Sequence, residues 1–500
     1  MAGKTSFQAI GVAGAIGLAL APCVRGATIT VDAGTKYQKI SGFGASTAWG
    51  SSMSAADADL LWSTTSGAGL SLHRIHIDPS NGSTSELPIA KLAVARNVTV
   101  WASPWTPPAA DKSNNNNVMG TLTNPSAFAT YLTGFVKKMK DNGVPIYAVS
   151  AQNEPDASVT YESCVYDGAS MATWVGGTMG PAFAGTGVKV MGPETQNWCG
   201  LQKFWPVLKA NANFMKYADI IATHEYGCSV TAYPDILAAG KEFWETEIYD
   251  TQGPADPGMG SGLRTAKLIH EAMTIASMSA WHFWWVYPGT NDNGALWDYN
   301  SKTPSKRMWV MGNYSRFVRP GFMRISATGT PASGVSISAY SSDKDGKLVI
   351  VAINTNSSAT SQDFKVSGAN PTAMTPWITD DSRSLVSGAA ANVTGNAFSY
   401  SLPSKSVTTL VLDFKSTSVV GRSVAALTMA RISTGFRIEL PSAESGRAQL
   451  VGLDGRIVAS VNFPAGTASL DLVSPATSEV VEARVVQGDR VSVSNLVVNR

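Results

Sequence analysis

The sequence predicts a (β/α)8 barrel with an attached side β-sandwich and a small C-terminal all-β module. Along residues 40–317, short β-rich runs alternate with segments of helical periodicity, which is the pattern of βα units on a parallel sheet. After the segment Arg319-Pro320-Gly321, the pattern changes to alternating strands separated by Gly, Ser and Asn turns. Beyond residue 415 the composition changes again, because all 14 Trp and all 14 Tyr residues come before that point.

The barrel is expected over residues 42–320. Its eight strands are expected at 42–45, 70–77, 98–103, 146–152, 188–193, 220–226, 242–247 and 280–287. A helix at 125–141 is expected to begin after Asn124, which is a good N-cap, and to stop at Gly143; another is expected at 261–277. Eight units in about 280 residues is the size of a TIM barrel, in which active sites lie at the carboxyl ends of the strands.

The rest of the chain is expected to form strands without helices. The side β-sandwich is assigned to residues 321–415, and the N-terminal stretch 27–41 is expected to join it. Its strands are expected at 325–339, 348–354, 373–379 and 407–414. A linker at 416–422 leads to a β module at 423–500, in which 448–453 and 456–461 are expected to form a hairpin around Asp454-Gly455. Because this module has no Trp or Tyr to stack on sugars, it is interpreted as a sorting or spacer module.

The N-terminus has the features of an export signal. Lys4 precedes an apolar run at 10–21 that is too short to span a bilayer, and cleavage is expected near Gly26. Residues 1–26 are therefore assigned to a signal peptide, and the mature protein is expected outside the cell. A lipoprotein signal at Cys23 is the alternative, although Pro22 stands where such signals carry a small residue. No later apolar run reaches the length of a membrane helix, so no membrane span is expected.

The charge balance excludes several kinds of partner. The chain has 38 Lys+Arg and 36 Asp+Glu, a net charge of +2, and only 15% of its residues are charged. Without a basic run to meet phosphates, nucleic acid is not an expected partner, whereas a neutral polysaccharide is. The five His residues form no HExxH motif and no i, i+4 pair, so no metal and no cofactor is expected. We expect a monomer that contacts its polysaccharide and, through the C-terminal module, a secretion or cell-surface sorting system.

Three cysteines follow the expected signal peptide, at Cys164, Cys199 and Cys228. An odd count allows one disulfide and one free thiol, and an oxidising compartment permits the bond. The pair expected is Cys164 with Cys199.

Two glutamates stand at the carboxyl ends of expected barrel strands. Glu154, in the segment Gln-Asn-Glu-Pro, follows the apolar strand at 146–152. Because side chains alternate along a strand, Glu245 and Glu247 are expected to point the same way, with Glu247 nearer the open end of the barrel. Two carboxyl groups that face each other across the barrel mouth suit the acid and the nucleophile of glycoside hydrolysis. Glu242 and Glu245 are rivals for the second role if the strand ends elsewhere.

Five segments occur in a fixed order along the chain. They are Ile40-Ser41-Gly42-Phe43-Gly44, Gln152-Asn153-Glu154-Pro155, Trp244-Glu245-Thr246-Glu247, Trp284-Trp285 and Phe317-Val318-Arg319-Pro320-Gly321. Together they resemble glycoside hydrolase family 30, and within it the bacterial xylanase and glucuronoxylanase branch, over residues 28–415. The resemblance implies that Glu154 is the acid/base, that Glu247 is the nucleophile of a retaining mechanism, and that Asn153 hydrogen-bonds the sugar 2-hydroxyl.

Further expectations concern how such a site would work. The charge on Glu247 is expected to raise the pKa of Glu154, which must stay protonated until it donates. His224 is expected to orient a catalytic carboxylate or bind sugar, and Arg74 to steady the charges from inside the barrel. Aromatic rings at strand ends are expected to stack on the flat faces of pyranose rings. The residues expected to bind substrate are Asn153, Trp101, Trp105, His224, Tyr226, Trp285 and Tyr287.

The stretch after the eighth strand departs from the glucuronoxylanases of this branch, which carry there an Arg that pairs with glucuronate. Residues 286–299 contain no basic residue, and Asp292 and Asp298 would repel an acidic branch. The resemblance therefore implies a secreted retaining endo-β-1,4-xylanase that does not depend strictly on glucuronate. The alternatives are a glucuronoxylan-specific endoxylanase that uses Lys302 or Arg307, an endo-β-1,6-galactanase, a β-glucosidase-like enzyme and a non-catalytic polysaccharide-binding protein.

Overall fold

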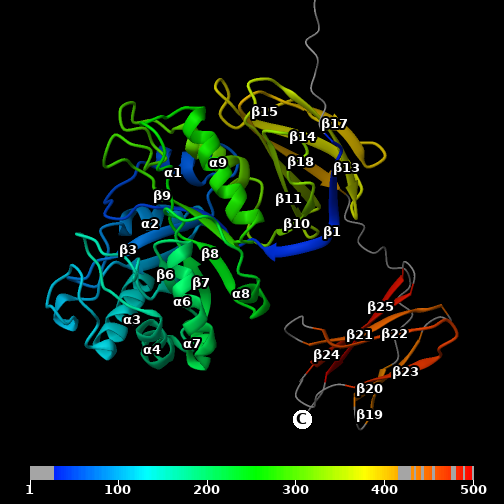
Figure 1. Ribbon diagram of the computed structural model, residues 1–500, viewed down its shortest axis with the longest axis horizontal. Coiled ribbons are helices and arrows are strands. Elements are labelled where there is room, and N and C mark those ends of the chain that lie inside the picture. The colour runs from blue at the N-terminus through cyan, green and yellow to red at the C-terminus, as the bar shows by residue number, and fades with distance from the viewer. Residues whose placement is uncertain are drawn as a thin grey trace, which may run out of the picture. The chain divides into compact units, whose positions relative to one another are not determined.

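The computed structural model describes residues 27–414 and those parts of 429–497 that lie outside five short gaps, at 433–434, 441–443, 453–456, 474–479 and 488–489 (Figure 1). The chain forms two compact units, Met1–Lys415 and Ser416–Arg500. The expected signal peptide at 1–26, the linker at 416–422 and the hairpin turn Asp454-Gly455 lie outside the described residues.

Eight parallel strands close into a barrel in the first unit, with β9 paired to β2, and this confirms the predicted (β/α)8 fold (Figure 1). They are β2 (Gly42–Ser46), β3 (Leu72–Ile77), β4 (Thr99–Pro104), β5 (Ile146–Ser150), β6 (Lys189–Thr195), β7 (Ala218–Thr223), β8 (Glu242–Glu245) and β9 (Ala280–Trp285). Every residue of β3 is buried, because helices cover the outside of the barrel and side chains fill its inside.

The interior of the barrel is filled below the carboxyl ends of its strands. Trp101 of β4 and Trp244 of β8 meet edge to face with ring centroids 6.1 Å apart. Leu72, Met191 and Ile220 pack around these two indole rings. Because these side chains fill the barrel below the carboxyl ends of the strands, a site is expected at the strand ends above them, as in other TIM barrels.

Helices surround the barrel and pack on the outward side chains of its strands. They are α1 (Ala55–Trp62), α2 (Leu87–Val94), η1 (Ala109–Asp111), α3 (Pro125–Asp141), α4 (Gly168–Trp174), η2 (Val175–Met179), α5 (Gly180–Phe183), α6 (Trp198–Ala210), α7 (Ala212–Tyr217), α8 (Pro234–Ala238), α9 (Met259–Thr274) and α10 (Lys306–Ser315). α3 has the bounds predicted for it: the Asn124 side chain accepts the Ala127 N–H, and Gly143 adopts a φ of 83° just past the end. The helix expected at 261–277 begins and ends slightly earlier, as α9.

A ten-stranded sheet forms the sandwich and includes the first strand of the chain. The strands are β1 (Ile29–Lys39), β10 (Met323–Ala327), β11 (Val335–Ser342), β12 (Lys347–Asn354), β13 (Thr360–Ser367), β14 (Pro371–Thr379), β15 (Val386–Ser387), β16 (Ala391–Asn392), β17 (Ala397–Leu402) and β18 (Ser406–Phe414). β1 pairs antiparallel with β10 and parallel with β13, and in Figure 1 it lies, in blue, among strands that come more than 280 residues later. The strand expected at 325–339 is two strands, β10 and β11.

The two faces of this sheet serve different contacts. Ile29 and Val31 of β1 pack with Ile350 of β12 and Leu410 of β18 in the core of the sandwich. Alternate residues of β12, such as Val349 and Val351, belong to the core of the barrel instead. The sandwich is therefore packed directly on the barrel, through α9 and α10.

The second unit is all β in its described parts. Its strands are β19 (Met429–Ile432), β20 (Gly435–Glu439), β21 (Gly446–Gly452), β22 (Ile457–Phe463), β23 (Ser469–Val473), β24 (Val480–Gln487) and β25 (Arg490–Val497). β21 and β22 pair antiparallel, and residues such as Phe436, Leu450 and Val485 form a small core.

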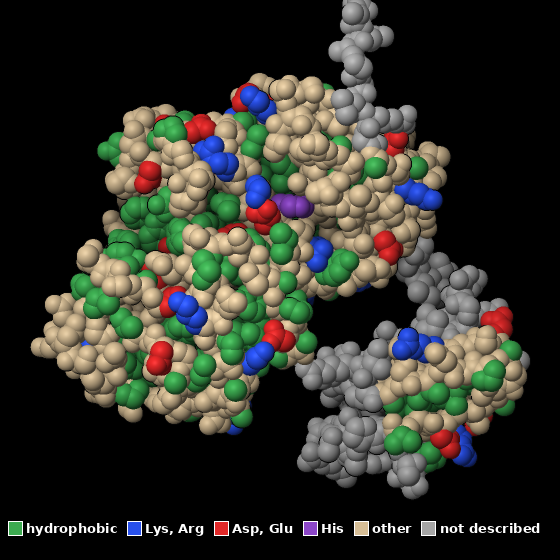
Figure 2. Space-filling model, in the orientation of Figure 1, with side chains coloured by type: hydrophobic (Ala, Val, Ile, Leu, Met, Phe, Trp, Pro, Cys, Tyr) green, Lys and Arg blue, Asp and Glu red, His purple; other side chains and the backbone are tan. Residues whose placement is uncertain are grey.

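Two surface properties concern the kind of partner that the protein meets. On the face drawn in Figure 2, charged side chains of both signs are scattered over a mostly uncharged surface. Within the described ranges, no helix combines the length and the apolar character that crossing a membrane requires.

Candidate active site

Glu154 lies at the mouth of the barrel, four residues after β5 ends at Ser150. Its backbone has a φ of 44°, a strained conformation for a residue with a side chain, and its N–H donates to the Glu194 carbonyl at 3.0 Å. The carboxylate is buried and accepts a hydrogen bond from the Tyr161 hydroxyl at 2.5 Å. Its other oxygen lies 3.2 Å from His224 Nδ1. The turn after β5 thus holds this carboxyl group at a fixed place in the mouth.

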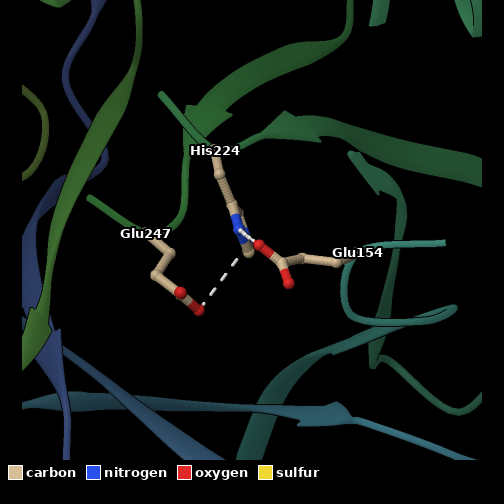
Figure 3. Close-up of side chains that lie close together, drawn as sticks. All are labelled: Glu154, His224 and Glu247. Carbon is tan, nitrogen blue, oxygen red and sulfur yellow. Dashed lines mark hydrogen bonds and ion pairs between the residues drawn. The ribbon is translucent and has the colours of Figure 1, made fainter. Parts of the chain in front are cut away.

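Glu247 lies two residues after β8 and points toward the same histidine from another side (Figure 3). Arg74 Nη1 donates to its Oε2 at 2.5 Å, and the Tyr226 hydroxyl donates to its Oε1 at 3.1 Å. His224 Nε2 is 3.9 Å from Glu247 Oε2. An oxygen of Glu154, a nitrogen of His224 and an oxygen of Glu247 all lie within 4.8 Å of one another. Two carboxyl groups therefore flank one imidazole ring.

Glu245 does not point the same way as Glu247, so the expectation from strand alternation is wrong. Trp244 packs inside the barrel, which turns its neighbour Glu245 away from the interior. The two Glu245 carboxylate oxygens accept the backbone N–H groups of Glu247 and His282. Glu242 lies at the other end of β8, where it binds Ser41 and Lys189, so neither rival reaches the mouth.

Arg74 of β3 connects the acidic groups beneath the mouth. Its Nη2 donates to Asn153 Oδ1 at 2.6 Å and to Glu194 Oε1 at 2.7 Å. The guanidinium is fully buried and lies 4.4 Å from the centroid of the Trp105 ring. One planar cation therefore fixes Asn153, Glu194 and Glu247 relative to one another.

The buried charges of the site nearly balance. Burial lowers the pKa of His224, but the charge of Glu247 and the hydrogen bonds with Glu154 and Glu194 raise it to about 10. Burial raises the pKa of Glu194, but Arg74 and His224 together lower it to about 2. Two cations, Arg74 and His224, thus face three carboxyl groups. Because an unpaired buried charge is costly, the balance favours one proton on the Glu154 and Glu247 pair.

The expectation of a raised pKa at Glu154 is wrong for the free site. Burial does raise the pKa of Glu154, but the hydrogen bond and charge of His224 and the hydrogen bond from Tyr161 bring it below its ordinary value. Burial raises the pKa of Glu247, which His224 and Arg74 only partly oppose. The surroundings therefore favour the ionised form of Glu154 more than that of Glu247, and His224 lies between the two carboxyl groups.

The same three side chains could offer ligands to a cation, but their contacts favour protons. Arg74 already donates to Glu247, and the raised pKa of His224, about 10, favours the protonated imidazole, which is not a metal ligand.

Aromatic rings form one wall of the mouth. Trp105 packs against Trp49, at 5.3 Å, and against Trp284, at 6.1 Å. Trp285 stacks on Trp284 at 5.6 Å and donates its indole N–H to the Ala48 carbonyl. Trp49 is 44% exposed, has a φ of 62°, and presents the most open ring of this cluster. The wall therefore contains the expected Trp285 together with Trp49, which the sequence did not single out, whereas the expected Trp105 belongs to the same cluster but is buried.

Two expected substrate contacts are not at the mouth. Trp101 is fully buried in the barrel plug, where its indole N–H donates to His282 Nε2 at 3.0 Å. Tyr287 packs on Trp297, and its hydroxyl donates to Asp57 of α1 at 3.0 Å. Trp101 lies too deep along β4, and Tyr287 is turned toward α1.

Sequence reasoning also missed two polar residues of the site. Glu194 lies near the end of β6, and its position at a strand end was a usable signal. Tyr161 lies on the loop after β5, is 44% exposed, and carried no periodic signal. Ser163 and Val165 of this loop donate backbone hydrogen bonds to the carbonyls of Asn117 and Gly120, so the loop is fixed by its neighbour.

The expected disulfide between Cys164 and Cys199 is wrong. Cys199 is bonded to Cys228, with Cα atoms 6.1 Å apart, and Cys164 is a buried free thiol. Cys199 lies in α6 and Cys228 follows β7, whereas Cys164 lies on the loop after β5. Both β5 and β7 are neighbours of β6 in the barrel, so strand order alone does not distinguish the two pairings.

A pair of buried carboxyl groups in the mouth of a (β/α)8 barrel, beside exposed aromatic rings, defines a glycoside hydrolase. The chain belongs to glycosyl hydrolase family 30: the TIM-barrel domain of that family matches residues 81–256, and its beta sandwich domain matches residues 321–410.

Known relatives agree with this assignment. The chain is 32% identical over 404 residues to glucuronoxylanase XynC of Bacillus subtilis (strain 168), covering 77% of this chain and 92% of XynC. Among solved structures, the subfamily 8 xylanase Xyn30A from Clostridium acetobutylicum matches with 33% identity and a TM-score of 0.71, over 77% of this chain and 99% of that one. The family 30 endoxylanase from Clostridium papyrosolvens C71 matches with 34% identity and a TM-score of 0.68, over 77% and 100%.

Proposed function

We propose that the protein is an endo-β-1,4-xylanase that cuts the xylan backbone with retention of configuration. The observation that carries the proposal is the Glu154 and Glu247 pair, whose oxygens approach within 4.8 Å at the mouth of the barrel. Retaining glycosidases hold their carboxyl groups about 5–5.5 Å apart, whereas inverting enzymes need about 6.5–9.5 Å to admit a water molecule. The relatives named as xylanases support xylan as the polymer.

In this mechanism Glu247 attacks the anomeric carbon and Glu154 protonates the leaving oxygen. Arg74 and Tyr226 hold Glu247 and stabilise its ionised form. Glu154 must carry a proton when the leaving oxygen departs, and His224, which is close to both carboxyl groups, is placed to pass one to it. After the glycosyl-enzyme forms, the ionised Glu154 takes a proton from water, which then attacks the same carbon.

The site is not expected to require glucuronate on the xylan. No basic residue lies in 286–299, and the nearby Arg307 is buried, with its guanidinium bound to the carbonyls of Ala295 and Asp256 and to Asn293 Oδ1. Lys302 lies 4.2 Å from the centroid of the Tyr299 ring and is exposed. A glucuronoxylan-specific enzyme is the second candidate, and Lys302 is the residue that favours it.

Product analysis tests the substrate. The protein is incubated with glucuronoxylan, arabinoxylan, unbranched xylan and β-1,6-galactan, and products are identified by mass spectrometry. Equal rates on unbranched xylan and glucuronoxylan are expected. Products with one glucuronate at a fixed position, lost in Lys302→Ala, would establish the second candidate, and cleavage of galactan alone would contradict both.

Paired variants test the two carboxyl groups. Glu247→Gln is expected to abolish turnover of an activated aryl β-xylobioside, because no nucleophile remains. Glu154→Ala is expected to retain the first step on this substrate, which needs no protonated leaving group, and azide is expected to speed the second step. Glu242→Gln, at the start of the strand that leads to the nucleophile, is the matched control and keeps wild-type rates. If the wild type and every variant bind xylan but none of them hydrolyses it, the protein is a non-catalytic binding protein.

We further infer that residues 1–26 direct export, that barrel and sandwich span 42–320 and 321–415, and that 423–500 is a sorting or spacer module. The change of composition at 416 supports the last boundary. N-terminal sequencing of the protein from culture medium tests the signal, with a start near Ala27 expected. A variant ending at residue 415 is expected to keep full activity and to lose cell-surface retention.

A further inference from the structure

The hydrogen-bond ladder between β8 and β9 is interrupted next to the proposed nucleophile. The two strands pair at Trp244 and Ala280, and the next bridge joins Ile248 to Phe283. Three residues that follow Trp244, Glu245 to Glu247, therefore lie opposite two residues of β9. This is a one-residue bulge, and bulges re-aim the side chains that follow them.

The bulge explains why Glu247 faces the mouth. Trp244 points into the barrel. With regular alternation, Thr246 would also point inward, and Glu247 would point outward. The extra residue reverses the alternation and turns Glu247 inward, to Arg74 and Tyr226.

A side chain takes the place of the missing ladder. Glu245 Oε1 accepts the backbone N–H of Glu247 at 2.7 Å, and Oε2 accepts the backbone N–H of His282 at 2.8 Å. The ring of His282 lies 2.8 Å, through Nδ1, from the Glu245 carbonyl. The Glu245 carboxyl group is fully buried and satisfies two backbone donors that the bulge would leave without a strand partner.

We propose that Glu245 is a positioning residue for catalysis, because its carboxyl group holds the bulge that aims Glu247 at the anomeric carbon. The inference rests on the proposed function, in which Glu247 is the nucleophile. Only a carboxyl group of this length offers two acceptors to the two N–H groups; glutamine offers one acceptor and a competing NH2 group. A small displacement of a reacting atom costs up to about 100-fold in rate.

The test compares Glu245→Gln with the control Glu242→Gln, which changes the same residue type on the same strand. For Glu245→Gln we expect a KM within twofold of wild type and a kcat lowered about 10–100-fold. The rate of covalent labelling by a 2-fluoro-xylobiosyl inactivator should fall by the same factor. The acid limb of the pH profile of kcat/KM is expected to move, because Glu247 no longer lies against Arg74. Glu242→Gln is expected to match wild type in all four readouts.

Unchanged kcat and labelling rates in Glu245→Gln would overturn the proposal. So would a loss of activity that is fully explained by a smaller folded fraction, with normal labelling per folded molecule. If Glu245→Gln fails to fold, Glu245→Asp, whose shorter carboxyl group reaches only one N–H, is measured against the same expectations. Glu247→Gln is assayed alongside: activity retained there contradicts the proposed function itself, whereas an inactive Glu247→Gln with a normal Glu245→Gln contradicts only the positioning role.

Discussion

Removing the disulfide bond between Cys199 and Cys228 is expected to lower the stability of the protein without lowering its catalytic rate. The bond closes a loop of 29 residues, and the entropy of closing such a loop in the unfolded chain corresponds to about 3.5 kcal/mol at 25 °C. Cys199 is exposed and Cys228 is half-buried, so changing both to serine removes little packed surface. The expected loss in the double variant is therefore close to the entropic value.

Activity should survive because the folded site has its own hydrogen bonds. The backbone N–H of His224 donates to the Thr195 carbonyl at 2.7 Å, and the backbone N–H of Tyr226 donates to the Gln196 carbonyl at 3.4 Å. These bonds join the segments that follow β7 and β6 without the disulfide. At 25 °C we expect kcat within about twofold of wild type, because the bond acts mainly on the unfolded chain.

Urea unfolding, followed by fluorescence with and without reductant, measures the effect. Reductant should bring the wild type to the stability of the double variant and leave the double variant unchanged. A loss under about 1 kcal/mol, or a large fall in kcat at full folding, would refute the reasoning. Cys164→Ala is the control, since Cys164 is unbonded; reductant should lower its stability as much as it lowers that of the wild type.

Three further changes probe the buried charges. Tyr226→Phe removes a donor to Glu247, so the pKa of that carboxyl should rise and the acid limb of kcat/KM should move up by about one pH unit, as a pH profile will show. Arg74→Met leaves Glu194 and Glu247 without their cation and should cost about 3–5 kcal/mol in urea unfolding; a loss below about 1 kcal/mol would contradict this. Burial raises the pKa of Glu225 to about 8, so the wild-type protein loses stability as pH rises from 5 to 8. The free energy of unfolding of Glu225→Gln, relative to that of the wild type, should therefore rise by about 1.4 kcal/mol per pH unit over this range. Parallel curves of stability against pH for the two proteins would contradict the shift.

Barrel and sandwich could be predicted because their signals are local. Eight apolar runs bounded by turns correspond to eight strands, and Asn124 and Gly143 mark the ends of α3. β13 and β17 were missed because their sequences alternate polar and apolar residues, with few residues that are apolar in succession, and β17 is also at the edge of the sheet. Periodicity finds a buried strand more readily than one with a solvated face.

Candidate site residues at strand ends were easier to predict than those on loops or inside the barrel. Glu154 and Glu247 follow strands, so topology brings both to the same end of the barrel. Trp101 lies in the plug and not at the mouth because of its depth along β4, and the sequence does not state depth. Trp49 and Tyr161 reach the mouth from loops, whose paths depend on contacts far along the chain.

The position of β1 between β10 and β13 makes the barrel an insertion within the sandwich. During synthesis β1 has no partner strand until β10 has been made, so its backbone N–H and C=O groups stay unpaired while the whole barrel is synthesised. Such distant pairing slows folding and leaves a strand edge open to wrong partners. The two domains therefore cannot be separated by a single cut, and a circular permutant that begins just after the barrel, with β1 joined behind β18, should reach the native sheet sooner.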